Sequence, residues 1–118
     1  FPVIMIGGNA GDFLGEYMAG GLLIVLGLSC GDPRSIVGRF CGTGMHNGTI
    51  YLRGNVDDYQ LGKEVKQFKA DKNDMDSLEE HIRDYCALFS IKPDGILKSK
   101  FIKLLPVTHR PYGKLYAY

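Results

Sequence analysis

Three short apolar segments in the first half of the chain, residues 3–6, 22–26 and 50–52, are each followed closely by a glycine. Short apolar runs bounded by turn residues are typical of β-strands, and a glycine after a strand lets the backbone turn sharply. The third run alternates and can expose one face to solvent, whereas residues 22–26 are apolar on both faces. We therefore expect three short strands, the middle one covered on both sides.

The second half of the chain has helical periodicity. One face of the expected helix carries Leu78, Ile82, Tyr85, Cys86 and Phe89. Asp76 followed by Glu79 is a workable capping pair at its start, with the pair one position later as the alternative register. Pro93 limits the helix at its other end. The pattern predicts a helix over about 75–90 and an extended apolar segment over about 100–106.

A repeat with an offset of 27 residues relates residues 11–27 to residues 38–54. The identical positions in the first copy are Gly11, Phe13, Gly15, Met18, Gly21 and Gly27. Their counterparts in the second copy are Gly38, Phe40, Gly42, Met45, Gly48 and Gly54. A third, partial copy is residues 3–7, which resemble residues 23–27 at an offset of 20. We treat the twelve repeated residues as structural positions of the fold, not as catalytic groups.

Repeats of a strand and a corner are the signature of a solenoid. A helical solenoid is excluded because glycines every three or four residues would cost about 1 kcal/mol each inside a helix. The pattern therefore predicts an all-β fold, a parallel β-helix of few coils over residues 1–56, in which Phe13 stacks over Phe40 and Met18 over Met45. The remaining residues, 57–118, form a tail.

The tail helix and the apolar outer face of residues 22–26 are expected to pack on each other, which would bury Leu78, Ile82 and Phe89. A solenoid usually needs about three coils for stability, and this sequence supplies two and a fragment. We therefore expect either additional N-terminal coils or oligomerisation that caps the open end of the β-helix.

Composition sharpens the fold prediction and excludes two classes of partner. Thirteen of the sixteen glycines lie in the first 54 residues, where the repeat needs corners. The net charge of +1 leaves no strong positive field for nucleic acid. No apolar run approaches the roughly 20 residues of a membrane span. Neither nucleic acid nor a membrane is an expected partner.

The cysteines, Cys30, Cys41 and Cys86, are odd in number and irregular in spacing. This argues against a disulfide framework and favours a reducing compartment, so we expect a cytoplasmic protein. The histidines are scattered and form no metal motif, so no metal site is expected. Small buried apolar residues are the simplest interpretation of the cysteines.

A competing interpretation takes Gly7–Gly15 as a phosphate-binding loop of a nucleotide-dependent enzyme. The glycine spacing fits the dinucleotide fingerprint only approximately. The segment that follows is too short, and too often interrupted by glycine, to form the required helix. Asp12, Glu16 and His46 could be catalytic groups in that interpretation, but solvated corner or capping residues explain them more simply. A helix starting at Gly11 would favour the enzyme.

The sequence resembles a known family at three places. Residues 16–27, EYMAGGLLIVLG, resemble a signature of the carboxy-terminal domain of the glutamate synthase large subunit, and residues 42–52 resemble its next coil. The tail elements Leu78-x-x-x-Ile82, Ile96-Leu97 and Phe101-x-Lys103-x-x-Pro106 also resemble that domain. The runner-up is the β-helical subunit of formylmethanofuran dehydrogenase, which shares the glycine repeat but not the Phe-x-Lys-x-x-Pro tail.

The resemblance implies a right-handed parallel β-helix with a helical tail and a non-catalytic scaffold role in ammonia assimilation. It implies that glutamine hydrolysis, FMN and iron–sulfur clusters belong to partner domains or subunits of a glutamate synthase, and that this chain holds no cofactor. A stand-alone chain of this kind resembles a split subunit. We expect no glutamate synthesis from this chain alone.

Overall fold

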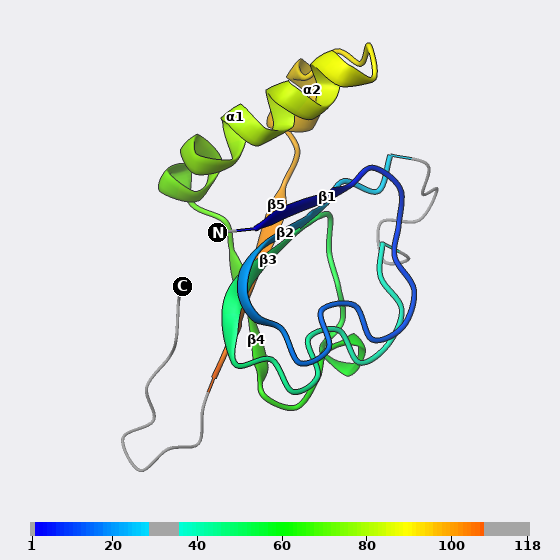
Figure 1. The fold of residues 1–118 in the computed structure, drawn as a ribbon, viewed down its shortest axis with the longest axis vertical. Helices are drawn as coiled ribbons and strands as arrows, with labels where there is room; N and C mark the ends of the chain where they lie inside the picture. The colour runs from blue at the N-terminus through cyan, green and yellow to red at the C-terminus, as the bar shows by residue number, and fades with distance from the viewer. Residues whose placement is uncertain (1, 29–35, 108–118) are drawn as a thin grey trace.

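The computed structural model describes residues 2–28 and 36–107, which form one mixed sheet with the helical segment of residues 72–97 on one side (Figure 1). The strands are β1 (Val3–Ile6), β2 (Ala19–Val25), β3 (Asn47–Arg53), β4 (Val65–Lys69) and β5 (Phe101–Pro106). The helices are α1 (Lys72–Leu88), α2 (Asp94–Leu97) and the short 3-10 turn η2 (Asp58–Gln60). The strand order is β1-β2-β3-β5-β4, with β1, β2 and β3 parallel and β5 antiparallel to both neighbours.

The 27-residue repeat coincides with the register between β2 and β3. Leu23 lies opposite Ile50 and Val25 opposite Leu52, each pair separated by 27 residues. Between β1 and β2 the register is Val3 opposite Leu22, an offset of 19 and not the 20 that the partial repeat predicted. A one-residue difference exchanges the two faces of a strand. The observed register of β1 with β2 therefore determines which side chains of β1 face each core.

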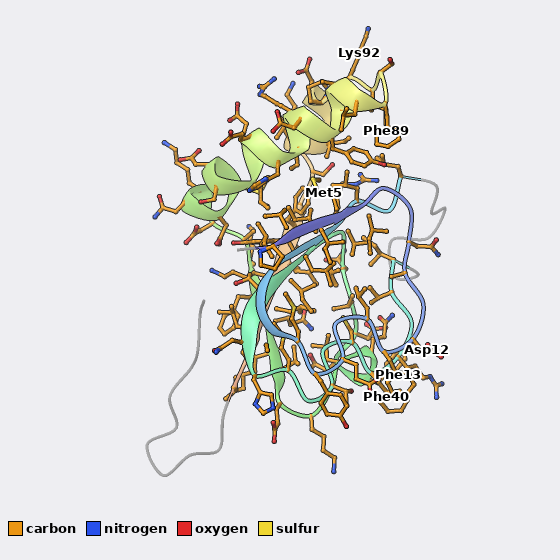
Figure 2. All side chains as sticks on the ribbon, in the orientation of Figure 1. Met5, Asp12, Phe13, Phe40, Phe89 and Lys92 are labelled. Carbon is orange, nitrogen blue, oxygen red and sulfur yellow. The ribbon has the colours of Figure 1, made fainter. Side chains whose placement is uncertain are left out.

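The glycine-rich segments that link the parallel strands run side by side. The Phe13 amide donates to the Arg39 carbonyl at 2.8 Å, and the Gly42 amide donates to the Leu14 carbonyl at 2.7 Å. The Phe13 and Phe40 rings stack with centroids 5.0 Å apart. Figure 2 shows both rings at the end of the molecule away from α1. These segments are bends and turns, apart from one isolated bridge between Cys41 and Leu61.

The prediction of an all-β, right-handed parallel β-helix is wrong. The fold is mixed α/β, with an open five-stranded sheet and one long helix. Two physical reasons account for the difference. The corner residues adopt left-handed backbone conformations that do not extend into further strands. The strand β5 then pairs antiparallel with β3, where a solenoid would continue with another parallel coil.

The sheet separates two apolar cores. On one face, side chains such as Leu23, Val25 and Ile50 pack with the glycine-rich segments. On the other face, Ile24 and Leu26 pack beneath α1 and α2. Alternate residues of β2 thus point into different cores, which explains why residues 22–26 are apolar throughout.

The helix α1 starts earlier than its predicted capping pairs. The Asp71 side chain accepts the Asp74 amide and the Asp74 side chain accepts the Asp71 amide, both at 2.9 Å. This reciprocal box leaves neither Asp76 nor Ser77 as the cap. Leu78 and Ile82 are fully buried against the sheet, as the packing prediction required, whereas Phe89 is 60% exposed. Phe89 follows the last helical residue and contacts Tyr85, with ring centroids 4.7 Å apart.

Candidate assembly surface

The strand β1 forms one edge of the sheet (Figure 1). The Leu22 amide donates to the Pro2 carbonyl at 2.9 Å and the Leu26 amide to the Ile6 carbonyl at 2.8 Å. Backbone groups alternate in direction along a strand, so those of Val3 and Met5 face away from β2. Such an edge is a template for pairing with another chain.

An apolar groove of about 400 Å³ opens beside this edge. Its walls include Ile4, Ile6, Leu14 and Met18, and Glu16 is the one acidic residue among the described lining residues. Ile4 is 58% exposed, although its register partner Leu23 is buried. The groove is therefore the uncovered end of the core that lies between the sheet and the glycine-rich segments.

The glycine repeat presents free amides at the same end. In the second copy, the Gly38 amide donates to the Gly11 carbonyl at 3.2 Å and the Gly42 amide to the Leu14 carbonyl at 2.7 Å. The equivalent amides of the first copy belong to Gly11 and Gly15, and neither has a hydrogen-bond partner among the described residues. Of these two residues, Gly15 also lines the apolar groove.

The twelve repeat positions are distributed over the corners and the core. Gly15, Gly21, Gly27, Gly42, Gly48 and Gly54 have positive φ angles. Met45 is buried and Met18 is half-buried. Phe13 and Phe40 also have positive φ, at 62° and 59°, which is a strained conformation for a bulky residue. Sequence reasoning identified these two phenylalanines as repeated residues but missed their backbone conformation.

The structure does not bring the candidate catalytic residues together. The Asp12 carboxylate accepts the Arg39 amide at 2.8 Å and so joins the two copies at a corner. Glu16 lies at the groove and His46 is exposed. No group of three metal-ligating side chains occurs in residues 2–28 and 36–107. The loop after Gly11 forms turns and not a helix, so the feature required for nucleotide binding is missing from the described region.

The two described cysteines are buried in separate cores. Cys41 is 0% exposed and Cys86 is 1% exposed. Burial raises the pKa of the Cys41 thiol to about 12 and raises that of Cys86 as well, so neither is a reactive thiolate at neutral pH. Cys30 lies outside the described residues.

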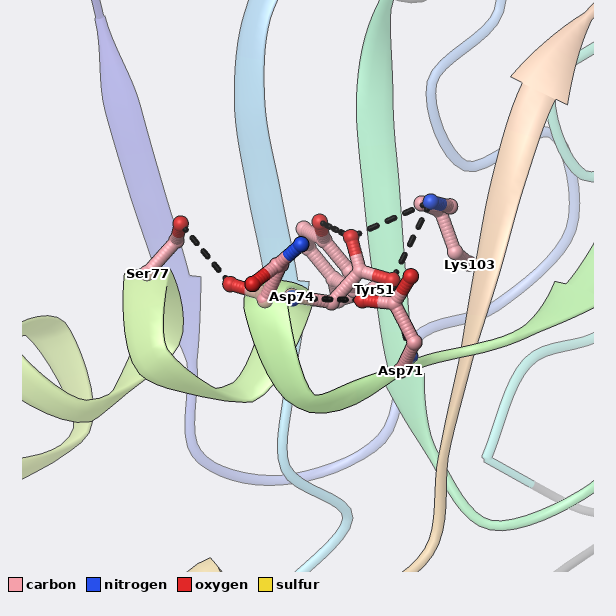
Figure 3. Close-up of polar contacts among 6 residues, drawn as sticks. Tyr51, Asp71, Asp74, Ser77 and Lys103 are labelled. Atoms are coloured by element: carbon pink, nitrogen blue, oxygen red, sulfur yellow. Dashed lines mark hydrogen bonds and ion pairs between the residues drawn. The ribbon is translucent and has the colours of Figure 1, made fainter.

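A polar cluster that sequence reasoning missed joins α1 to the sheet (Figure 3). The Tyr51 hydroxyl donates to the Asp74 carboxylate at 2.7 Å, and the Lys103 ammonium donates to it at 3.1 Å. Burial opposes ionisation of Asp74, but the hydrogen bonds from Tyr51, Asp71 and Lys103 outweigh it and lower the pKa of Asp74. Burial and the bond to Asp74 raise the pKa of Tyr51. The cluster fixes the start of α1 on β3 and β5.

Comparisons with known proteins place these features in context. A family model described as the GXGXG motif matches residues 1–107. The uncharacterized protein MJ1350 of Methanocaldococcus jannaschii is 43% identical over 122 aligned residues, which cover 98% of this chain and 46% of that protein. The chain thus spans about half the length of this relative. No solved structure matches the chain significantly. Within the described residues, no helix is long and apolar enough to cross a membrane.

Proposed function

The chain belongs to the GXGXG motif family, and from that premise we propose that it is a non-catalytic assembly domain of a glutamate synthase-type complex in ammonia assimilation. GXGXG motif domains occur in glutamate synthase-like proteins. In the proposed complex, glutamine hydrolysis and the FMN and iron–sulfur chemistry belong to partner domains or subunits. This chain supplies a surface that holds them in place.

The observation that carries the proposal is the uncovered end of the sheet. The sequence predicted that the tail helix covers the apolar side of residues 22–26, and helices α1 and α2 do cover that side, so it is not free for a partner. The β1 edge and its adjoining groove remain uncovered by the described residues, and Val3 and Ile4 are 37% and 58% exposed. An apolar groove beside a free strand edge favours strand addition by a partner chain.

The test is affinity purification of the tagged chain from its native source. We expect a flavin-containing chain to co-purify and to bring glutamine-dependent glutamate synthesis, which we expect the isolated chain to lack. Ile4→Glu should abolish this association because it places a charge in the groove. Leu88→Glu is the matched control, because Leu88 is 80% exposed at the end of α1.

Three results would contradict the proposal. One is glutamate synthesis by the chain alone. Another is the absence of any flavin-containing synthase chain among the co-purifying proteins. The third is equal recovery of that chain with Ile4→Glu and with Leu88→Glu. A second copy of this chain could also occupy the β1 edge. Sedimentation of the isolated chain tests this, because a dimer would then form without any partner protein.

A further inference from the structure

A second pocket, of about 290 Å³, lies where β2 and β3 end next to the start of β5. Its lining includes two cations, Arg53 and Lys100, and two neutral polar residues, Asn55 and Ser99. None of its described lining residues is Asp or Glu. The pocket therefore gathers positive charge without an acidic counterpart, in a chain whose net charge is only +1.

The guanidinium of Arg53 is held rigidly in this pocket. Its Nε donates to the Leu26 carbonyl, Nη2 donates to the Gly27 carbonyl at 3.3 Å, and Nη1 donates to the Ser99 hydroxyl at 3.2 Å. A guanidinium has five N–H groups, so about two remain for another acceptor. Arg53 is half-buried and makes no ion pair with a described residue. The three hydrogen bonds thus fix the orientation of the guanidinium, and water reaches only part of it.

Lys100 supplies a second cation from the segment before β5. Its carbonyl accepts the Gly54 amide at 2.9 Å, which anchors its backbone directly beside the strand end that carries Arg53. Its ammonium has neither a hydrogen-bond nor an ion-pair partner in the part of the chain that the structure describes. Two cations at one concave site raise the local concentration of anions.

We propose that this pocket binds a small oxyanion, a phosphate or carboxylate group carried by a small molecule. The remaining N–H groups of Arg53 can donate to two oxygens of a carboxylate or phosphate group. The Lys100 ammonium adds a second positive charge that attracts the same group. Asn55 adds a neutral polar side chain to the lining. The Ser99 hydroxyl donates to the Gly95 carbonyl at 2.8 Å and accepts from Arg53, so its role is to hold the guanidinium in place. The proposal does not depend on the assembly function, because β1 and its groove contribute no residue to this pocket.

The experiment is an NMR titration of the full chain with sodium phosphate, with sodium acetate as a second arm and sodium chloride at matched ionic strength as the blank. We expect saturable amide shifts centred on Gly54, Asn55 and Lys100. Lys100→Glu should weaken the affinity by on the order of tenfold or more, because it replaces an attraction with a repulsion. Lys66→Glu, a change at an exposed lysine of β4, is the charge-matched control and should leave the affinity unchanged.

The arms of the titration separate the two chemistries. Saturation by phosphate alone identifies a phosphate site, and saturation by both salts identifies a general oxyanion site. Shifts that chloride reproduces, shifts that never saturate, or equal weakening by Lys100→Glu and Lys66→Glu would each overturn the proposal. Arg53 is left unchanged in every variant because its bonds to Leu26 and Gly27 hold the strand ends together.

Discussion

The two faces of the sheet are closed in different ways. Beneath α1, the core is sealed by a capped helix, by the fully buried residues Leu78 and Ile82, and by the polar cluster around Asp74. Beneath the glycine-rich segments, the core is sealed by turns and remains open at the β1 end, where Ile4 is 58% exposed. The helix face is covered by this chain's own helices, whereas the open end is an exposed apolar surface, which the proposed function assigns to a partner.

The two copies of the repeat differ in what lies next to them. The 27-residue pattern aligns β2 with β3 and stacks the corner residues, so each copy covers its neighbour. The first copy has no such neighbour beyond β1 among the described residues. Stability should therefore depend mainly on the helix face and the inner corners, and association on the open end.

The largest effect on stability is expected on the helix face. Leu78→Ala should lower the free energy of unfolding by about 2–5 kcal/mol, because Leu78 is 0% exposed and its removal leaves a cavity between α1 and the sheet. Leu88→Ala is the control, since Leu88 is 80% exposed on the same helix. Urea denaturation measures both. A loss of less than about 1 kcal/mol for Leu78→Ala would mean that α1 does not seal this core.

A somewhat smaller loss is expected at Gly48, near the start of β3. Gly48 has a φ of +98°, and a Cβ atom there would lie 3.0 Å from backbone atoms of Gly20 and Gly21. Gly48→Ala should cost about 1–3 kcal/mol in the free energy of unfolding, from strain in the left-handed conformation and from this crowding. Gly20→Ala is the matched control, because nothing lies within 4 Å of its Cβ position. Equal thermal stability of the two variants would show that β3 tolerates a side chain at this position next to β2.

The polar cluster gives a pH-dependent prediction. The folded-state pKa of Asp74 lies below its unfolded value of 3.8, so its contribution to stability is present above that value and is lost as pH falls through the folded pKa. Asp74→Asn should lower stability at pH 7 by about 1–3 kcal/mol and flatten the decline on acidification. Denaturation at a series of pH values measures this slope. The exposed Asp76→Asn should keep the wild-type slope, and a parallel decline in both variants would exclude Asp74 as its source.

The sequence predicted the structure best where contacting residues recur at a regular spacing along the chain. The 27-residue offset matches the register of β2 with β3, and the helical spacing of Leu78 and Ile82 matches their burial. Glycine at a corner also has a local physical cause, since positive φ suits residues without a side chain. These features depend on short stretches of chain and their direct copies.

The features that sequence reasoning missed depend on distant segments. Whether β5 pairs antiparallel with β3 is a choice among competing strands that no local pattern records. The contacts of Asp74 with Tyr51 and Lys103 span 23 and 29 residues. Phe13 and Phe40 have left-handed backbones although phenylalanine disfavours them, because the stacked corners impose that conformation. The β-helix prediction was wrong because it assigned residues 1–56 to coils of their own, whereas their linking segments are turns and the sheet continues into β5 and β4 from the tail.

The smallest effect on stability is expected at the open end, where the comparison of the two faces is tested most directly. Ile4→Glu should change the free energy of unfolding of the isolated chain by less than about 0.5 kcal/mol. Ile4 is already 58% exposed, so the carboxylate of the substituted glutamate can reach water. Differential scanning calorimetry at low concentration measures this value. The same substitution should abolish association with a partner, so stability and assembly separate at one residue. If Ile4→Glu instead destabilised the chain as strongly as Leu78→Ala, the open end would be part of a self-sufficient core, and the two faces of the sheet would not differ in the way their exposures indicate.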